Sequence, residues 1–555
     1  MTVYITAGSV SCSPCNIVKY PVEFSGNIEY LPYYKTFNEH KQSIDLLCQK
    51  IEQHIFIALK NANLDISFLD ENPLFLSSTS FHISQGELLY PNIGETSLYQ
   101  FNAISEKLKK NHPKWKIYNI ATSCTSSANA IIYAKNAIDC HFYQNAIIVG
   151  FECFNDLSLS NFHAMGLISN TYQPFQEEGF ILGEGIAVIV LQNNIENNVN
   201  AFTIKGSGCL NGKNNIAAVD FNTIQNTIEQ ALKNANIHYQ NINLIKANAV
   251  GSNSDQDEKN IYQNLFPKTP MIFFKHQIGN TLGASVLIET VLLLHLFNNK
   301  QFTLLNNEKH SFRLPENNHT QGDILICGFG FGGNCTALVI GKNNTNKNNL
   351  QSTINKNLSL INVSQFNCMG KTDNQTLKQL IKQQFNLDAR RLSRLTMSSL
   401  LGVLPLSIED KNTSVYIGIA FSSPEKFQQQ MMRLFNKEIA KPFDFIYNIA
   451  NAPAFEITKS LDINGNALCC AVPQDEYTAW QQVLMMAISD LILGKTPNAI
   501  ICLSYEDLNG DCQTNALLLS NMTINQKMKD INIDQNKSHF LDDLIQLLMI
   551  TFQPA

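Results

Sequence analysis

The sequence has no excess of positive charge. Its 40 Lys and Arg residues stand against 46 Asp and Glu residues, which gives a formal net charge of -6. The runs of lysine are short and interrupted. Proteins that bind nucleic acid or anionic lipid usually carry a basic face. We therefore expect neither of them as a direct partner.

Membrane and export signals are also missing. No apolar stretch approaches the roughly 20 residues that span a bilayer. The first residues, Met1 to Ala7, are typical of a strand and lack the basic start and apolar run of a secretion signal. We expect a protein without a membrane span in the cytoplasm, where its 14 cysteines stay reduced.

Metal and nucleotide motifs are equally weak. Cys12-Ser-Pro-Cys15 is a single CxxC without a second pair nearby, and we interpret it as a loop rather than a zinc site. The glycine-rich run from Gly328 to Gly333 lacks the Gly-Lys-Ser/Thr ending of a phosphate loop. The sequence predicts no bound metal or resident cofactor.

The chain divides at one low-complexity segment. Its 555 residues can form about three domain-sized units. Residues 342–358 are rich in Asn and Lys, have almost no apolar periodicity, and predict a linker between a module at 1–341 and a smaller one at 359–520. Residues 521–555 form a tail. Apolar strand-like runs alternate with helical stretches in the first module, which predicts a layered α/β fold. The strand candidates include Ala146–Gly150, Ile186–Leu191, Leu244–Ala247, Ile324–Gly328 and Thr336–Ile340.

One cysteine occupies a position suited to nucleophilic chemistry. Small residues from Ala121 to Ser127 follow the strand-like run Tyr118–Ile120 and lead into a helical segment, Ala128–Ile138. Cys124 would lie near the positive N-terminus of that helix, which favours the thiolate. The alternative is that Cys124 packs as a small apolar side chain.

Further motifs follow Cys124 in a specific order. They are Asn161–Ser169, Pro174-Phe175 with Gly179–Gly185, Asn248–Glu258, Lys275–Glu289 and Gly328–Gly333. With the cysteine elbow they resemble the β-ketoacyl synthase family of thiolase-fold condensing enzymes over most of residues 1–341. The resemblance implies a thiolase-like fold with α-β-α-β-α layers.

In that family the cysteine accepts an acyl chain from the phosphopantetheine arm of an acyl carrier protein, and two histidines help to decarboxylate a malonyl unit. Here both histidine positions are asparagine, Asn248 and Asn280. An asparagine amide can donate a hydrogen bond but cannot titrate. His276 is the only imidazole nearby in the matched motif and is a possible substitute. Lys275 and Glu289 are retained.

The resemblance assigns roles to individual residues. Cys124 is the nucleophile, Asn248 and Asn280 are amide donors at the thioester carbonyl, and Lys275 and Glu289 support the site. The predicted substrate contacts are Phe162 in an acyl-tunnel loop, Ser252 at the phosphopantetheine arm, and Phe331 and Gly332 in a gating loop. Two alternatives stay open: Asn161–Ser169 as a helix packing face, and the glycine run as a tight strand-end turn.

The second module resembles the N-terminal half of a ketosynthase again, as in half domains found beside polyene and polyketide machinery. Asn145–Glu152 is similar to Asn498–Glu506. The ungapped offset between them places Tyr477 where the first module has Cys124, so we expect no nucleophile in this copy. An unrelated α/β domain is the alternative. An exposed half of a thiolase fold should pack against a partner surface.

Three functional classes remain. We expect a ketosynthase-family protein of fatty acid or polyketide type, polyene included, that takes an acyl group from acyl carrier protein on Cys124; acyl transfer is better supported than condensation. The alternatives are a non-condensing, chain-length-factor-like partner subunit, and a thiolase-fold acyl hydrolase or transferase outside lipid assembly. The resemblance also implies a homodimer or a heterodimer with another ketosynthase.

Overall fold

Strands and helices alternate along the chain, as its apolar pattern predicts. The structure is a computed structural model that describes residues 2–13, 16–24, 26–81, 83–90, 100–195, 201–297, 300–305, 322–342, 358–420 and 422–521. Up to residue 342 its strands are β1 (Tyr4–Cys12), β2 (Ile17–Phe24), β3 (Asn27–Tyr34), β4 (Leu74–Ser77), β5 (Ile117–Ile120), β6 (Asn145–Glu152), β7 (Leu182–Gly183), β8 (Gly185–Gln192), β9 (Phe202–Asn211), β10 (Ile242–Lys246), β11 (Met271–Ile272), β12 (Phe302–Leu305), β13 (Asp323–Phe329) and β14 (Asn334–Lys342).

Helices connect these strands. They are α1 (Ile44–Asn61), α2 (Phe68–Glu71), α3 (Ile83–Leu89), α4 (Ala103–Asn111), α5 (Ser126–Asp139), α6 (Asp156–Ala164), α7 (Phe221–Ala235), α8 (Asp255–Leu265), α9 (Lys275–Ile278) and α10 (Ser285–Leu296). From residue 358 on, the order is β15 (Ser359–Cys368), α11 (Asn374–Phe385), α12 (Arg394–Val403), β16 (Ser414–Ile419), α13 (Pro424–Phe435), α14 (Pro442–Ile446), α15 (Ala452–Leu461), β17 (Ala467–Ala471), α16 (Glu476–Ile492), β18 (Asn498–Glu506) and β19 (Cys512–Ser520).

The elements predicted for the first part of the chain, by which we mean its described residues up to 342, are confirmed. All five strand candidates coincide with strands β6, β8, β10, β13 and β14, apart from Ala247, which follows β10. Cys124 lies between β5 and α5 as expected. The linker predicted over 342–358 and the tail over 521–555 lie outside the described residues except for Lys342, Leu358 and Asn521. That division of the chain therefore stays a prediction.

Two helices are buried in the middle of the first part. Every residue of α10 from Ser285 to Leu294 is buried, and α5 buries nearly its whole circumference. A helix that is apolar on all sides needs neighbours on all sides. Strands β1, β6 and β8 cover α5 and α10 on one side, and β13 and β14 cover them on the other. Helices α1 and α4 lie outside the first strand group, and α7 and α8 lie outside the second. The α-β-α-β-α layering is confirmed.

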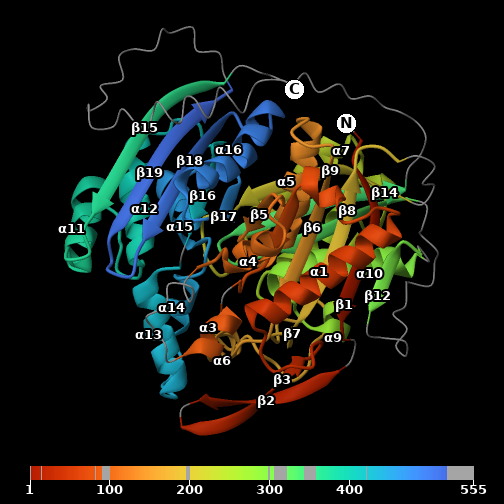
Figure 1. The fold of residues 1–555 in the computed structure, drawn as a ribbon, viewed down its shortest axis with the longest axis horizontal. Helices are drawn as coiled ribbons and strands as arrows, with labels where there is room; N and C mark the ends of the chain where they lie inside the picture. The colour runs from red at the N-terminus through yellow and green to blue at the C-terminus, as the bar shows by residue number, and fades with distance from the viewer. Residues whose placement is uncertain are drawn as a thin grey trace.

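The second part of the chain, its described residues from 358 to 521, continues the sheet of the first part. The central strand order is β1-β8-β6-β4-β5-β17-β16-β18-β19-β15, and Figure 1 shows the blue strands extending the sheet of the orange ones. Strand β4 is parallel to β5 and β6, and β16 is parallel to β17 and β18. The antiparallel pairs β6–β8 and β8–β1 correspond to β18–β19 and β19–β15. The second part thus repeats five strands of the first in reversed order, as two subunits do around a two-fold axis.

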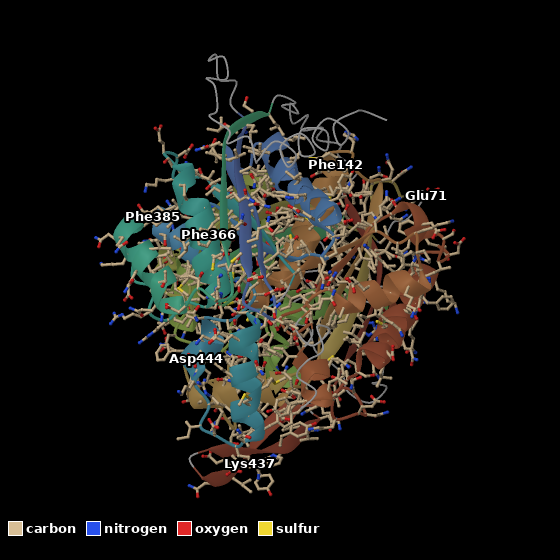
Figure 2. The ribbon with its side chains drawn as sticks, turned by 60° about the vertical axis from the view of Figure 1, so that its left-hand side comes forward. Glu71, Phe142, Phe366, Phe385, Lys437 and Asp444 are labelled. Atoms are coloured by element: carbon tan, nitrogen blue, oxygen red, sulfur yellow. The ribbon has the colours of Figure 1, made fainter. Side chains whose placement is uncertain are left out.

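The seam between the two parts is an antiparallel contact of β5 with β17. Ile120 pairs with Cys470, and the N–H of Ala121 donates to the Cys469 carbonyl over 2.9 Å. The side-chain amide of Asn119 donates to the Ala471 carbonyl over 3.0 Å. In Figure 2, Lys437 and Asp444 mark the end of the second part that reaches the β2–β3 hairpin. There, Lys437 forms an ion pair of 3.3 Å with Glu23.

A buried polar cluster joins the helices behind the seam. The Asp490 carboxylate on α16 accepts hydrogen bonds from the Tyr133 and Tyr416 hydroxyls, both over 2.7 Å, and from the Asn136 amide over 2.8 Å. The Lys495 ammonium donates to the Asn136 side chain over 2.6 Å. Burial raises the pKa of Asp490 and lowers that of Lys495. Because buried polar groups are costly when unpaired, this cluster favours one arrangement of the two parts.

No helix among the described residues combines the length and the apolar character that crossing a membrane requires.

Replacing Asp490 by Ala removes the acceptor shared by two buried hydroxyls and the Asn136 amide, and it removes the negative charge that offsets the buried Lys495 ammonium. We expect Asp490→Ala to lower the free energy of unfolding by about 3 to 5 kcal/mol, measured by urea denaturation. The control Asp388→Ala removes an exposed ion pair with Arg390 and should cost less than about 1 kcal/mol. Equal effects of the two substitutions would contradict a role for the cluster.

Candidate active site

The elbow that carries Cys124 is a tight turn built from small residues. Ser123 has a positive φ of 50°, which starts the 3-10 turn Ser123–Thr125 before α5 begins at Ser126. Gly330 lies directly against it, because a Cβ at Gly330 would come within 2.9 Å of the Cys124 Cβ. The turn and the glycine run therefore fit each other closely, and only a glycine allows this approach.

Cys124 lines a cavity of about 60 Å³ whose walls come from both parts of the chain. The first part contributes Thr79, Ile83, Phe101, Ala121, Ser123, Leu157, Ser158, Phe162, Leu282 and Phe331. The second part contributes Ser422, Phe427, Gln430, Phe445, Asn448, Ile449 and Ala450. Within the described residues, this lining includes no charged side chain and no histidine. The thiol therefore faces a small and largely apolar space.

Phe162 lies in this cavity on the buried face of α6. Its ring centroid is 5.8 Å from that of Phe331 and 5.7 Å from that of Phe445. Asn161–Ala164 belong to α6, and Phe162 packs there while it also borders the space above the thiol. The acyl-tunnel role of Asn161–Ser169 stays a prediction. Phe331 borders the same space from the glycine run.

Asn451 of the second part holds the elbow and the glycine run together. Its side-chain carbonyl accepts a hydrogen bond from the Ser123 hydroxyl over 2.6 Å, and its amide donates to the Phe331 carbonyl over 3.0 Å. A Cβ at Gly332, where φ is 80°, would lie only 2.0 Å from the Asn451 Nδ2. Gly332 is therefore required for the close approach of Asn451.

The environment of Cys124 differs from the sequence-based expectation of a favoured thiolate. Burial raises the pKa of the Cys124 thiol to about 11, against the opposing effect of the Phe331 backbone N–H, and the Glu152 carboxylate also raises it. Desolvation thus outweighs the helix terminus. The free protein holds Cys124 as a thiol at neutral pH.

Lys275 and Glu289 form a buried ion pair of 2.8 Å, as their retention implies. A third residue, Lys246 at the end of β10, binds the other Glu289 oxygen over 2.6 Å and also donates to the Cys327 carbonyl. Burial opposes the charge on Glu289, but the two ammonium groups outweigh it and hold the pKa of Glu289 below its usual range. Sequence reasoning missed Lys246, although a lysine in an otherwise apolar strand was a usable signal.

The two asparagines that replace histidines are buried. Asn248 donates its backbone N–H to Glu258 over 2.6 Å, and its carbonyl accepts from Lys275 over 2.8 Å. The Asn280 side chain accepts from the N–H of Leu282, which lines the cavity. Asn280 is thus held against a residue that lines the cavity, whereas Asn248 is held by Glu258 and Lys275, and neither asparagine is itself in the lining. His276 is exposed and its ring contacts Gln277, so it does not take over the position of Asn280.

Ser252 lies in the turn before α8, where its N–H donates to Asp255 over 3.2 Å. It is not among the residues that line the cavity, and its contact with a phosphopantetheine arm stays a prediction. Among the described residues no group of His, Cys, Asp and Glu side chains could hold a metal ion.

The strand register corrects the position assigned to Tyr477. Ile120 pairs with Cys470 across the seam, and Cys124 lies four residues after Ile120 and two before α5. The same offsets from Cys470 and from the start of α16 both give Gln474. The ungapped comparison was wrong by three residues because α16 has 17 residues where α5 has 14, and the offset was taken from the strands that follow these helices. The second copy has an amide where the first has its thiol.

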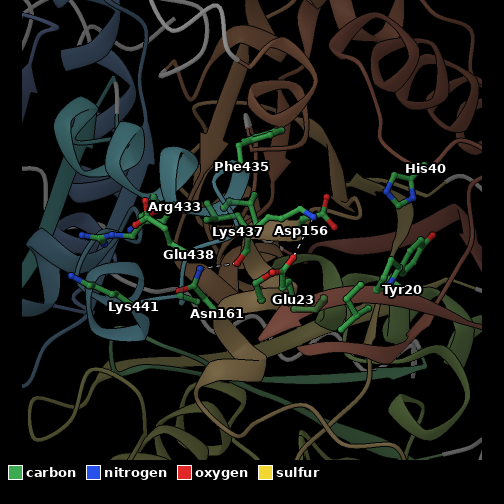
Figure 3. Close-up of a pocket in the computed structure, with 18 residues that line it drawn as sticks. Tyr20, Glu23, His40, Asp156, Asn161, Arg433, Phe435, Lys437, Glu438 and Lys441 are labelled. Carbon is green, nitrogen blue, oxygen red and sulfur yellow. Dashed lines mark hydrogen bonds and ion pairs between the residues drawn. The ribbon is translucent and has the colours of Figure 1, made fainter. Parts of the chain in front are cut away.

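A second, larger space lies beside the cavity. A groove of about 480 Å³ runs between the β2–β3 hairpin, α6 and α13, and shares Leu157 and Gln430 with the cavity lining. Figure 3 shows the groove with Tyr20 and His40 near one end and Arg433, Glu438 and Lys441 near the other. Leu157 and Gln430 therefore lie between the groove and the cavity.

The raised pKa of Cys124 predicts how its reactivity depends on pH. The thiolate fraction below the pKa rises about tenfold per pH unit, so we expect the rate of Cys124 alkylation by iodoacetamide to rise in that way between about pH 7 and pH 9. Peptide mass spectrometry at several times measures it. The pKa of a free cysteine is about 8.5. A rate that levels off near that pH would contradict the argument that burial raises the pKa of Cys124.

Comparisons with known proteins show which families the sequence is similar to. The family model "Beta-ketoacyl synthase, N-terminal domain" matches residues 116–196, and "Beta-ketoacyl synthase, C-terminal domain" matches residues 201–306. No curated protein matches the sequence.

Solved structures share the fold. The "PfaC Keto synthase-Chain length factor" superposes with a TM-score of 0.68 and 13% identity, over 94% of this chain and 78% of that one. A β-ketoacyl synthase from Burkholderia phymatum STM815 has a TM-score of 0.50 and 16% identity, over 62% of this chain and 100% of that one. Residues 116–196 and 201–306 thus match β-ketoacyl synthase family models, and the fold is the thiolase-like fold of the solved ketosynthase structures.

Proposed function

We propose that the protein transfers acyl groups in fatty acid or polyketide assembly, with Cys124 as the acceptor and residues 358–521 as a built-in, chain-length-factor-like unit. The observation that carries this proposal is the position of Cys124 in an apolar cavity walled by both parts of the chain. An acyl carrier protein presents the substrate as a phosphopantetheine thioester.

The transfer step exchanges one thioester for another. The Cys124 thiol loses its proton, the sulfur attacks the thioester carbonyl, and the phosphopantetheine thiolate leaves and takes up a proton. Backbone N–H groups of Phe331 and of Cys124 itself lie against the sulfur, where they can stabilise the negative oxygen of the tetrahedral intermediate. The apolar walls suit the alkyl part of the substrate.

Condensation is less well supported than transfer. Decarboxylation of a malonyl unit places negative charge on the thioester oxygen, and the amides of Asn248 and Asn280 can donate to it without titrating. A misplaced donor at each position would lower the rate by about 10²-fold to 10³-fold. Acyl loading does not depend on this step.

A second candidate is a partner that never carries an acyl group. The absence of charged and histidine side chains from the described cavity lining favours it, together with the raised pKa of Cys124. The ion pair of Lys275 with Glu289 favours the first candidate, because a wholly structural chain has little use for two buried ammonium groups around one carboxylate.

The built-in second unit covers the strand edge at which a dimer partner would be expected. In the described residues, the edge of β5 is already paired with β17 of the same chain. We therefore propose that the contact between two ketosynthase-like units is made within one chain here, with the carrier protein as the transient partner.

The size of the cavity bears on the length of the acyl chain. About 60 Å³ corresponds to roughly two water molecules, which is too little for a long alkyl group. The neighbouring groove is eight times larger, at about 480 Å³. Leu157 lies on α6 of the first part, and Gln430 lies on α13 of the second and donates to the Asp444 carbonyl over 2.8 Å. We propose that long chains displace these two side chains and continue into the groove.

Removing the Cys124 thiol tests whether this residue accepts the acyl group. We expect Cys124→Ala to abolish covalent loading from hexanoyl-carrier protein, while Cys140→Ala, which removes a partly buried thiol at the end of α5, loads normally. Intact-mass spectrometry measures both. Equal loading of the two variants would refute the nucleophile, and no loading of any variant would favour the structural partner.

Filling the groove tests the path of long chains. Ala440 lines only the groove, so we expect Ala440→Trp to lower loading of dodecanoyl groups at least tenfold without changing hexanoyl loading. The control is Gln428→Trp, an exposed position on α13 that lines neither space. Dodecanoyl loading that is insensitive to Ala440→Trp would rule out the groove as the path.

A further inference from the structure

Two cysteines face each other across a pair of strands far from Cys124. Cys368 ends β15, Cys512 begins β19, and the register pairs them directly. Directly opposed residues in antiparallel strands have Cα atoms about 4.5–5.5 Å apart, inside the range of about 4.4–6.8 Å that disulfides span. In the strands that the structure describes, no other two cysteines are paired in register.

A guanidinium lies beside this pair. The Nη2 of Arg394 contacts the Cys368 sulfur at 3.0 Å and donates to the Met369 carbonyl over 2.9 Å. Its remaining donors go to neutral oxygens of Gly510, Thr372 and Asn374. Arg394 is 5% exposed, and no described carboxylate forms an ion pair with it. Arg394 thus places a positive charge directly against the Cys368 sulfur, and the Asp373 and Glu506 carboxylates also lie within electrostatic reach of its guanidinium.

The Cys368 and Cys512 thiols differ in their exposure to solvent. Cys368 is partly exposed and Cys512 is buried, and both line a surface groove of about 630 Å³ that also contains Gln474. Burial raises the pKa of the Cys512 thiol. An accessible cysteine beside a cation, with a second cysteine behind it, is the usual arrangement of a reactive and a resolving thiol. The guanidinium also disfavours a bound metal cation, because like charges repel at this distance.

We propose that Cys368 and Cys512 are a thiol–disulfide exchange site that reacts with small disulfides of the glutathione class. The Cys368 thiolate attacks one sulfur of the small disulfide, forms a mixed disulfide and releases one small thiolate. Cys512 then gives up its proton and attacks the Cys368 sulfur, which releases the second small thiolate. Two protein thiols are oxidised and one small disulfide is reduced to two thiols.

The product links the ends of β15 and β19. Strand β15 is the last strand of the described sheet and pairs only with β19 there, so the new bond fastens an edge strand at the rim of the groove that holds Gln474. This site is independent of the chemistry at Cys124.

The test uses the full chain with Cys124→Ala, so that the cavity thiol does not interfere. After incubation with glutathione disulfide, alkylation of remaining thiols and digestion, we expect mass spectrometry to find a peptide pair joined through Cys368 and Cys512, and dithiothreitol to separate it. In Cys512→Ser, a glutathione adduct should persist on Cys368. In Cys502→Ser, which removes a buried thiol on β18, the cross-link should form at the unchanged rate.

Arg394→Met should slow the reaction at least tenfold, because it removes the guanidinium that contacts the attacking sulfur. Should that variant not fold, the order of iodoacetamide alkylation in the folded protein decides the same point, with Cys368 expected before Cys140 and Cys209, the other partly exposed thiols. No cross-link between Cys368 and Cys512, or glutathione adducts that form first on other cysteines, would overturn the proposal.

Discussion

The antiparallel contact of β5 with β17 is the constraint on which the site depends. Strand β5 ends only four residues before Cys124, so whatever covers that edge also covers the thiol. Here the cover is the second part of the same chain, which brings Phe445 and Asn451 to the elbow. The hydrogen bonds of Asp490 behind the seam hold α5 and α16 in this relation. An unpaired β5 would instead present an open strand edge and an exposed apolar helix surface.

Burial explains the chemistry of the site as much as residue identity does. The desolvation that comes with an apolar lining raises the pKa of Cys124, and neither Asn248 nor Asn280 can accept a proton as a histidine would. The charges of Lys246, Lys275 and Glu289 are instead engaged with one another in buried ion pairs. Under the proposed function, the site therefore offers a cysteine and an apolar cavity, but no described side chain in the lining that accepts a proton as histidine does.

The local features of this fold could be predicted from the sequence, and the contacts between distant segments could not. Periodicity and the small residues around Cys124 identify β5, α5 and the elbow because these depend on neighbouring residues. Asn451 follows Ser123 by more than three hundred positions, and nothing in its local sequence indicates a hydrogen bond to that side chain. The position of Gln474 needed the strand register, since ungapped comparison cannot detect that α16 is three residues longer than α5. Helix-terminus reasoning suggested a thiolate at Cys124, but it omits the cost of desolvation, which depends on the cover from the second part.

The central claim is that the two parts together enclose one acyl site at Cys124. A crystal structure of the protein after alkylation of Cys124 with an iodoacetamide that carries a dodecyl chain tests it most directly. The account predicts a chain that leaves the Cys124 sulfur, passes Phe162 and Phe445, and continues between Leu157 and Gln430 into the groove beside α13. A chain that lies wholly against the first part, or that leaves the cavity without touching residues 422–450, would contradict it.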